Sequence, residues 1–406
     1  MAMNYEFSGP ENMKIRGKQT GLNGKENKNG VGFPKFYEKR CFSADPKVGR
    51  VLFLVGDKIG APARFRVYQY LDYLNTIGVK YTILASNPPK HYLPSPRKKK
   101  IVRFIIGRFC EMLKIINAIT RVLMAPFYDI VFLQRDLLSL NTFPWEIWGL
   151  NTFPWLEILL RKLSKKFIFD FDDAIFAYKP RKISKIVAMS DFTIVGNKYL
   201  KEYAQKYSSH VEIIPTPVDT DKYFPIDKQN RQEKEVTIGW MGSWSNMKEI
   251  QILVPSLKKL SEKHNFRFII VSNFLPNLNF LNELDFTFHA WKPEKEVEEL
   301  QIFDIGVMPL FDTRVNRGKC PLKALLYMAA GIPVVASPVG LNREIIIDGV
   351  NGFLASDKED WAEKLSRLIE DKHLRKKIAE AERKTVEEKY SVRANFYKLL
   401  GILMKI

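Results

Sequence analysis

Short apolar runs alternate with amphipathic stretches of helix length along most of the chain. The runs fall at residues 51–55, 79–85, 129–134, 166–171, 191–196 and 211–215, and again at 236–241, 266–272, 286–290, 305–310 and 333–336. A continuous apolar run of this kind is typical of a strand buried on both faces of a parallel sheet. Two successive series of strands and helices predict an α/β protein with two doubly wound, Rossmann-like domains.

Polarity along the chain sets the predicted domain boundaries. Residues 1–48 are polar and aperiodic, which predicts a disordered extension. We assign 49–225 to an N-terminal domain and 226–390 to a C-terminal domain, with the charged segment 221–235 as the linker. Residues 391–406 are predicted to form a C-terminal helix that packs back on the first domain.

A strand, helix and strand are predicted within residues 304–356, and both ends of the helix are marked. Pro321 suits the first helical position, and Gly331 suits the left-handed residue just past the end. The loops that leave the two strands carry Arg314, Arg317 and Lys319, and then Gly340, Leu341 and Asn342. Cations and a glycine turn before a helix suit a phosphate-bearing ligand at the carboxyl edge of a sheet.

A second glycine turn is predicted where the strand at 236–241 ends. Gly242 and Ser243 follow this strand, and Lys248 lies at or near a helix start. Exposed backbone amides and a nearby lysine suit a diphosphate. The chain contains neither a GxGxxG fingerprint nor a GxxxxGK[ST] loop, which disfavours a dehydrogenase or an ATPase.

Charged residues also follow two strands of the first half. Asp170, Asp172 and Asp173 lie at a strand's carboxyl end, where carboxylates bind sugar hydroxyls, hold a metal or cap the next helix. No further acid is close enough in sequence for a dedicated metal cage. Arg64 and Arg66 follow the first strand, and either neutralise phosphate groups or are solvated helix residues.

A formal charge of +19 is the outlier in the composition of this 406-residue chain. Such a field attracts nucleic acid, anionic lipid or phosphorylated substrates, or serves only solubility. No recognised module interleaves aromatic and basic residues, so we expect no nucleic-acid partner. The three cysteines lack metal-ligand spacing and are too few for a disulfide framework, which favours a reducing cytoplasm.

The basic charge is concentrated in one amphipathic block, residues 97–125. Between Lys90 and Arg121 there are nine Lys or Arg residues and a single acid, Glu111, and apolar residues recur at helical spacing. A basic amphipathic helix is a candidate for binding a membrane surface. The alternative is an ordinary core helix whose Lys and Arg side chains face water.

The order of these segments resembles glycosyltransferase family 4, the retaining enzymes of the GT-B fold. The resemblance is most specific over residues 318–337 (GKCPLKALLYMAAGIPVVAS) and 344–354, with further similarity at 169–176, 195–200 and 214–219. It implies a donor site on the C-terminal domain, an acceptor site on the N-terminal domain and catalysis in the cleft between them, without a metal or other cofactor.

The resemblance also implies roles for single residues. Lys248 matches the lysine that contacts the donor diphosphate, and Ser243 stands where many members have an arginine. The donor side then comprises Gly242, Ser243, Lys248, Lys319, Gly340, Leu341, Asn342 and Glu344. The catalytic residues are predicted to be Asp172, Asp173 and Lys323, and the acceptor side to include Arg64, Arg66 and Arg135.

Two positions depart from the family pattern. Members often carry two glutamates, toward the donor sugar and the ribose, where this chain has Gly318 and Leu326. Ser243 and the repeated segment LNTFPW, at 140–145 and 150–155, are also unusual. These departures motivate an alternative, a catalytically degenerate scaffold or partner subunit.

The leading hypothesis is a retaining glycosyltransferase of cell-surface polysaccharide synthesis. Its predicted partners are a nucleotide-sugar donor and a glycan or lipid-linked acceptor. Residues 97–125 would hold it at an anionic membrane surface. The chain is therefore expected in the cytoplasm, peripheral at the inner face of the membrane.

Overall fold

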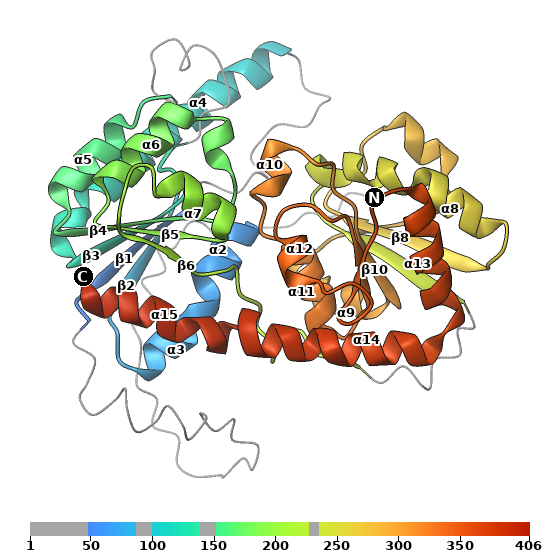
Figure 1. Cartoon of the computed structure of the whole chain (residues 1–406). Coiled ribbons are helices and arrows are strands. Elements are labelled where there is room, and N and C mark those ends of the chain that lie inside the picture. Colours follow the sequence, from blue (N-terminus) through green and yellow to red (C-terminus); the bar gives the residue numbers. More distant parts are fainter. Residues whose placement is uncertain (1–47, 87–99, 139–151, 227–234) are drawn as a thin grey trace, which may run out of the picture. The chain divides into compact units, whose positions relative to one another are not determined.

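Two parallel six-stranded sheets, each flanked by helices, form the framework of the protein (Figure 1). The computed structural model describes residues 48–86, 100–138, 152–226 and 235–406, without the side chains of 100–108 and 111. Nearly all of the predicted N-terminal extension, most of the linker and the first LNTFPW copy lie outside the described residues. The predicted fold class, α/β with two doubly wound sheets, is confirmed.

The first sheet has the strand order β2-β1-β3-β4-β5-β6. All of its neighbouring strands pair in parallel. The strands are β1 (Val51–Val55), β2 (Tyr81–Ala85), β3 (Ile130–Gln134), β4 (Lys166–Phe171), β5 (Phe192–Val195) and β6 (Val211–Ile213). The order reverses between β1 and β3, and ligands of doubly wound sheets bind outside the carboxyl ends of strands at such a point.

The second sheet repeats this plan with the order β12-β11-β10-β7-β8-β9. It is also parallel throughout. The strands are β7 (Val236–Met241), β8 (Phe266–Ser272), β9 (Thr287–Ala290), β10 (Ile305–Met308), β11 (Val334–Ala336) and β12 (Phe353–Leu354). Its order reverses between β7 and β10, so the loops after these two strands meet at one point of the sheet edge.

The helices bury apolar faces against both sheets, because parallel strands need cover on either side. In the first half they are α2 (Ala61–Arg66), α3 (Leu71–Thr76), α4 (Lys100–Leu123), α5 (Trp155–Leu163), α6 (Pro180–Met189) and α7 (Lys198–Ala204). In the second half they are α8 (Val254–Ser261), α9 (Glu296–Gln301), α10 (Arg314–Arg317), α11 (Leu322–Ala329), α12 (Asn342–Ile345), α13 (Lys358–Glu370), α14 (Lys372–Thr385) and α15 (Val392–Lys405).

Two helical stretches are interrupted. Residues 61–76 divide into α2, a short 3-10 turn and α3. Within that turn, the Gln69 amide donates to the carbonyl of Pro217 and accepts from the backbone N–H of Asp219. The polar stretch 361–390 is interrupted at Asp371, whose carboxylate caps α14 by accepting from the N–H of Leu374.

The ends of α11 and the last helix complete the fold. Pro321 caps α11 instead of occupying its first turn, whereas Gly331 has the predicted left-handed conformation, with φ +67°. On α15, the ring of Phe396 lies 5.1 Å from that of Tyr73, so this helix contacts α3 of the first half. No helix in the described part of the chain combines the length and the apolar character needed to cross a bilayer.

Candidate functional site

Lysines gather at the carboxyl edge of the second sheet, where its strand order reverses. Lys248 follows β7, and Lys319 follows β10. The ammonium of Lys319 donates to the side-chain oxygen of Asn246 at 3.1 Å, which joins the two loops. From α11, the Lys323 ammonium lies 4.4 Å from the centre of the Trp240 ring. Gly242 passes so close that a Cβ there would lie 3.0 Å from Cε of Lys323.

The lysines repel one another, and this repulsion adds to burial in lowering the pKa values of Lys319 and Lys323. Burial and the charge of Lys319 lower the pKa of Lys323 to about 7. Burial likewise lowers the pKa of Lys319, and Lys248 adds to that shift while Glu249 and Asp173 oppose it. A cationic cluster that is short of counter-charge favours an anion, because bound phosphate would favour the charged form of Lys319 and Lys323.

Glu249 holds the adjoining loop in place instead of neutralising the lysines directly. This buried carboxylate accepts from the backbone N–H of Phe311 at 2.7 Å and from the side-chain amide of Asn316 at 3.0 Å. Glu249 thereby holds the loop after β10 at two points, Phe311 and Asn316. Lys319 therefore emerges from a loop of defined shape.

A cavity of about 310 Å³ lies beside the loop after β11. Its lining includes Asn197, Tyr199, Arg317, Gly340, Leu341 and Glu344. Gly340 has φ +55°, and a Cβ there would lie 2.6 Å from the carbonyl oxygen of Arg317. Asn342 does not line this cavity, because it is buried and its side chain donates to the carbonyl of Ser337. The predicted donor loop thus borders a cavity, but through its glycine, Leu341 and Glu344.

The aspartates after β4 are held by a residue in an unusual backbone conformation. Arg135 follows β3 with φ +62°, and no other described non-glycine residue has positive φ. Its guanidinium donates to Asp172 at 2.9 Å and to Asp173 at 2.5 Å. Asp173 also interacts electrostatically with Lys319, so the predicted catalytic carboxylate and the lysine cluster are neighbours.

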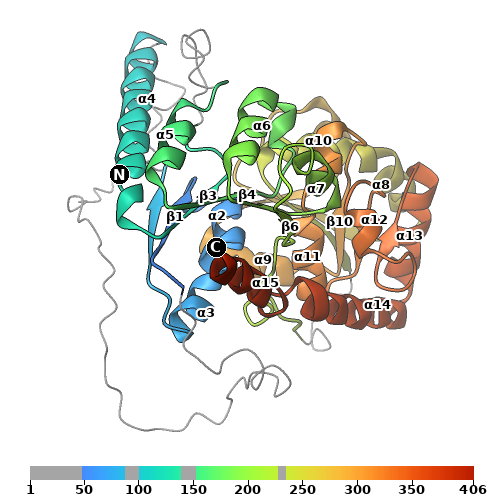
Figure 2. The same cartoon turned by 60° about the vertical axis from the view of Figure 1, so that its left-hand side comes forward.

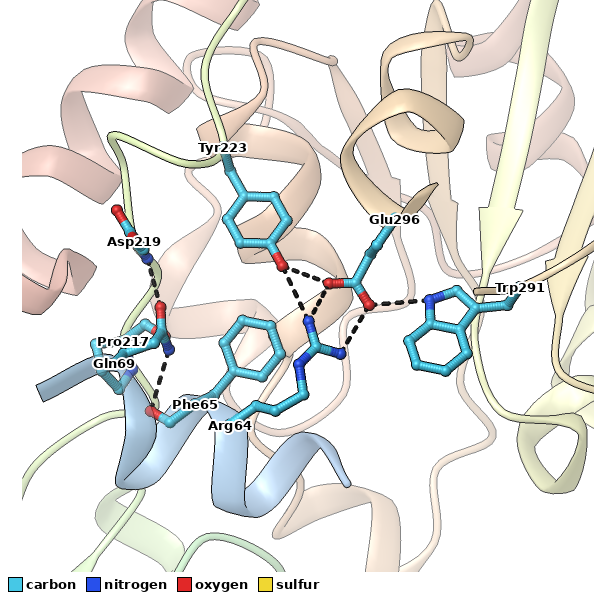
Figure 3. A network of polar contacts seen from close by, with 8 residues as sticks. All are labelled: Arg64, Phe65, Gln69, Pro217, Asp219, Tyr223, Trp291 and Glu296. Carbon is cyan, nitrogen blue, oxygen red and sulfur yellow. Dashed lines mark hydrogen bonds and ion pairs between the residues drawn. The ribbon is translucent and has the colours of Figure 1, made fainter. Parts of the chain in front are cut away.

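The two arginines of α2 make internal contacts. Arg64 donates to Glu296 at 3.0 and 2.5 Å, within a network that includes Tyr223 and Trp291 (Figure 3). Arg66 is 4% exposed and pairs with the buried carboxylate of Asp170. Both guanidinium groups therefore bind partners inside the protein. Of the three predicted acceptor-side arginines, Arg135 is the one that donates hydrogen bonds to Asp172 and Asp173.

Gly318 lies where the chain permits no side chain. A Cβ there would lie 2.6 Å from the Cβ of Ala174, the residue after Asp173. The Gly318 carbonyl also accepts a hydrogen bond of 3.0 Å from the side chain of Asn197. The family's first glutamate therefore cannot be accommodated at this position without a shift of the neighbouring backbone.

Sequence reasoning missed several residues of the site. Asn197 and Tyr199 line the cavity, and Trp240 and Glu249 support the lysines. Asn197 follows Gly196 at the end of β5, and this strand-end position was an available signal. In the described residues, no group of three or more His, Cys, Asp or Glu side chains is arranged to hold a metal.

These two parallel sheets, with a charged edge on each, define the GT-B class of fold. Residues 235–371 match the family model "Glycosyl transferases group 1". The match covers most of the C-terminal half of the chain. The narrower assignment to family 4 stays a prediction.

The chain is also similar to curated relatives over part of their length. The chain is 28% identical over 185 residues to the capsular polysaccharide biosynthesis glycosyltransferase CapM of Staphylococcus aureus, covering 41% of this chain and 47% of CapM. It is 22% identical over 255 residues to spore coat protein SA of Bacillus subtilis, covering 55% and 65% of the two chains. The chain thus spans about half to two thirds of the length of these relatives.

Solved structures show the same fold. A glycosyltransferase from Rickettsia africae superimposes with a TM-score of 0.62 and 17% identity, covering 88% of this chain and 98% of the other. HepE from Anabaena, solved with UDP and glucose, superimposes with a TM-score of 0.60 and 15% identity. The match covers 88% of this chain and 100% of HepE. At these identities the solved structures show the fold.

Proposed function

We propose that this protein is a retaining glycosyltransferase that moves a sugar from a nucleotide-sugar donor to a hydroxyl group of a glycan acceptor. We further propose that the acceptor is lipid-linked and that the product belongs to a cell-surface polysaccharide. The proposed location is the cytoplasmic face of the membrane. CapM, one of the relatives, is named for capsular polysaccharide biosynthesis, which supports this choice of pathway class.

The lysine cluster at the second sheet edge carries the proposal. Lys319 and Lys323 converge there from a loop and a helix, and the pKa of Lys323 is lowered to about 7 by burial and by Lys319. A diphosphate would relieve this repulsion, and its developing charge would be stabilised most as it leaves the sugar. HepE, which has the same fold, was solved with UDP and glucose, in keeping with a nucleoside diphosphate as the ligand class.

The proposed reaction needs no group beyond the donor, the acceptor and the protein. The bond between the anomeric carbon and the diphosphate oxygen breaks, and a bond from that carbon to the acceptor oxygen forms on the same face. The leaving phosphate takes the acceptor's proton. Asp172 and Asp173, held by Arg135, position sugar hydroxyls beside Lys319.

A panel of nucleoside diphosphates and their sugars tests this function. We expect UDP, GDP or dTDP to raise the melting temperature, since a ligand that binds only the folded state stabilises it. Lys319→Ala should weaken this binding at least tenfold, by about 1.5–3 kcal/mol for a lost charged hydrogen bond. Lys259→Ala, which removes an exposed lysine of α8, is the matched control. The anomeric configuration of the product, read by NMR, tests retention.

Absence of both nucleotide binding and transfer across the panel would overturn the proposal. Binding without transfer would favour the second candidate, a degenerate scaffold. That candidate rests on Leu326, which is 6% exposed and packs in the apolar core of the second half. The resemblance to family 4 implies a ribose-binding glutamate at this position. Leu326→Glu separates the two: a strong gain in binding or activity indicates an impaired site, and no change indicates a site that works without the glutamate.

A further inference from the structure

One face of α4 presents large apolar side chains to solvent. Eight of them, on α4 and the turn after it, are between 36% and 60% exposed: Phe109, Met112, Leu113, Ile116, Ile119, Leu123, Met124 and Phe127. On the helix itself they recur at spacings of three and four residues, so they form one continuous stripe. We call these eight residues the α4 stripe.

Other residues of α4 pack into the fold. Ala118 and Val122 are completely buried, and Ile115 packs with Leu138 and Leu156. Figure 2 shows α4 beside α5, which covers one side of it and leaves the other side uncovered by any described element. The α4 stripe is therefore apolar surface beyond what the core requires.

This arrangement separates the two interpretations of the basic amphipathic block. An ordinary core helix would bury its apolar residues and turn only polar ones to water. Here the described part of α4 buries Ala118, Val122 and Arg121 on its inner side, and its outer side carries large apolar residues as well. Contiguous exposed apolar surface of this kind marks a binding surface for a protein or a membrane.

We propose that the α4 stripe docks into the surface of an anionic lipid bilayer, with α4 lying along the interface. Charge decides between the occupants. Nine Lys or Arg residues against one acid lie between Lys90 and Arg121. Five of these cations belong to the sequence of α4 itself, and of these five Arg121 is buried: Lys100, Arg103, Arg108, Lys114 and Arg121. Cations beside an apolar face suit anionic headgroups. A second copy of this chain would bring the same cations and be repelled.

Docking of this kind is independent of catalysis. None of the eight residues of the α4 stripe contributes to the lysine cluster or to the cavity beside Gly340. A bilayer anchor and a donor site can therefore fail separately. If the function proposed above also holds, the stripe would keep the enzyme at the surface where a lipid-linked acceptor lies.

Co-sedimentation of the full chain with vesicles tests the docking. We expect binding to phosphatidylcholine vesicles that contain phosphatidylglycerol, weaker binding to pure phosphatidylcholine, and partial release by salt. Ile116→Gln/Leu123→Gln should lower the affinity for anionic vesicles by at least about tenfold, because two large apolar groups no longer leave water. Ile347→Gln/Val350→Gln is the matched control, since these residues are 61% and 55% exposed in the second half.

Several results would overturn the proposal. One is equal vesicle binding by the wild type and the α4 variant; another is no binding of the wild type to either vesicle. A dimer that dissociates in the α4 variant, seen by sedimentation velocity, would assign the stripe to a second copy. If the first variant has a lowered melting temperature, Phe109→Gln/Phe127→Gln provides an independent pair with the same expected loss. Nucleotide binding should be unchanged in every α4 variant.

Discussion

Arg64 and Glu296 form a bidentate ion pair between α2 and α9, although 232 residues separate them in the chain. Their side chains are only 18% and 6% exposed. Tyr223 donates to the same carboxylate, as does the indole of Trp291 at 2.9 Å (Figure 3). Every oxygen of Glu296 thus has a partner, and the pair joins the first half of the molecule to the second.

Removing one member of this pair should destabilise the protein strongly. Glu296→Ala would leave the mostly buried Arg64 without its counter-charge, at a cost of about 3 kcal/mol in the free energy of unfolding. Urea unfolding at pH 7 measures this. Lys258→Ala is the control, because the Lys258–Glu283 pair is about half exposed and should contribute less than about 1 kcal/mol. Equal effects of the two variants would contradict the prediction.

The same pair makes the free energy of unfolding depend on pH in the acid range. Burial opposes ionisation of Glu296, but hydrogen bonds and charge from Arg64 hold its pKa below the ordinary value of 4.5. A carboxyl whose pKa is depressed in the folded state stabilises above its unfolded pKa, and the contribution is lost as pH falls through the folded value. The stability difference between the wild type and Glu296→Gln should therefore shrink below about pH 4.5.

Lys323 should give a dependence of the same sign in the ligand-free protein, but at higher pH. Burial and Lys319 lower its pKa to about 7, from an ordinary value of 10.5. Between these values the unfolded chain binds more protons, so stability from this group rises with pH. The free energy of unfolding of the wild type, relative to Lys323→Met, should increase from pH 7 to pH 10. A constant difference over that range would contradict the lowered pKa.

The affinity for the donor should also depend on the protonation of Lys323, but it should fall as pH rises. A nucleoside diphosphate is fully charged above pH 7 and attracts the protonated form of Lys323. Its affinity should therefore fall as pH rises from 7 to 9, with proton uptake on binding. Calorimetry in two buffers of different ionisation enthalpy measures that uptake. Lys323→Met should bind more weakly at pH 7 and lose most of the pH dependence.

Arg135 combines an ion pair with a strained backbone, and two substitutions separate the effects. Arg135→Ala removes the partner of Asp172, whose side chain is 10% exposed, and should cost about 3 kcal/mol. Arg135→Gly also relieves the positive φ of 62°, so it should be about 1 kcal/mol more stable than the alanine variant. Chemical unfolding of both variants checks the order, and the reverse order would refute the strain.

Gly340 should be required for the shape of the neighbouring cavity. In Gly340→Ala the new Cβ would lie 2.6 Å from the Arg317 carbonyl oxygen, so the loop after β11 must move away from α10. We expect weaker nucleotide binding and a lower melting temperature. Gly349→Ala is matched in backbone strain, with φ +75°, but its Cβ meets only a ring atom at 4.0 Å. It should lower stability and leave nucleotide binding unchanged.

The sheets were predictable because most strands are short and largely apolar. Of the twelve strands in the described residues, only β12 was not predicted, since Phe353 and Leu354 alone are too short to form a pattern. The lysines of the site were predictable as well, because Lys248 and Lys319 follow strands that end at one sheet edge. Trp240 was not, since a buried strand tryptophan looks the same in sequence whether or not a lysine stacks on it.

Other features had no signal along the chain. An arginine in a sequence does not predict a positive φ, yet Arg135 has one. Its side chain binds two aspartates that follow a different strand. The periodicity of α4 predicted a helix but could not say how much of its apolar surface would be covered. The covered area of α4 depends on how α5 and the first sheet pack around it in the folded protein.

By itself the sequence determined the two doubly wound sheets, the strand ends and the residues that follow them, because hydrophobic period and turn chemistry act over short distances. Only the tertiary structure decided which charges meet. It paired Arg64 with Glu296 and Arg66 with Asp170, brought Lys319 near Asp173, and left the α4 stripe in water. The physical reason is that charge pairing and burial depend on distances in space, which no local pattern encodes.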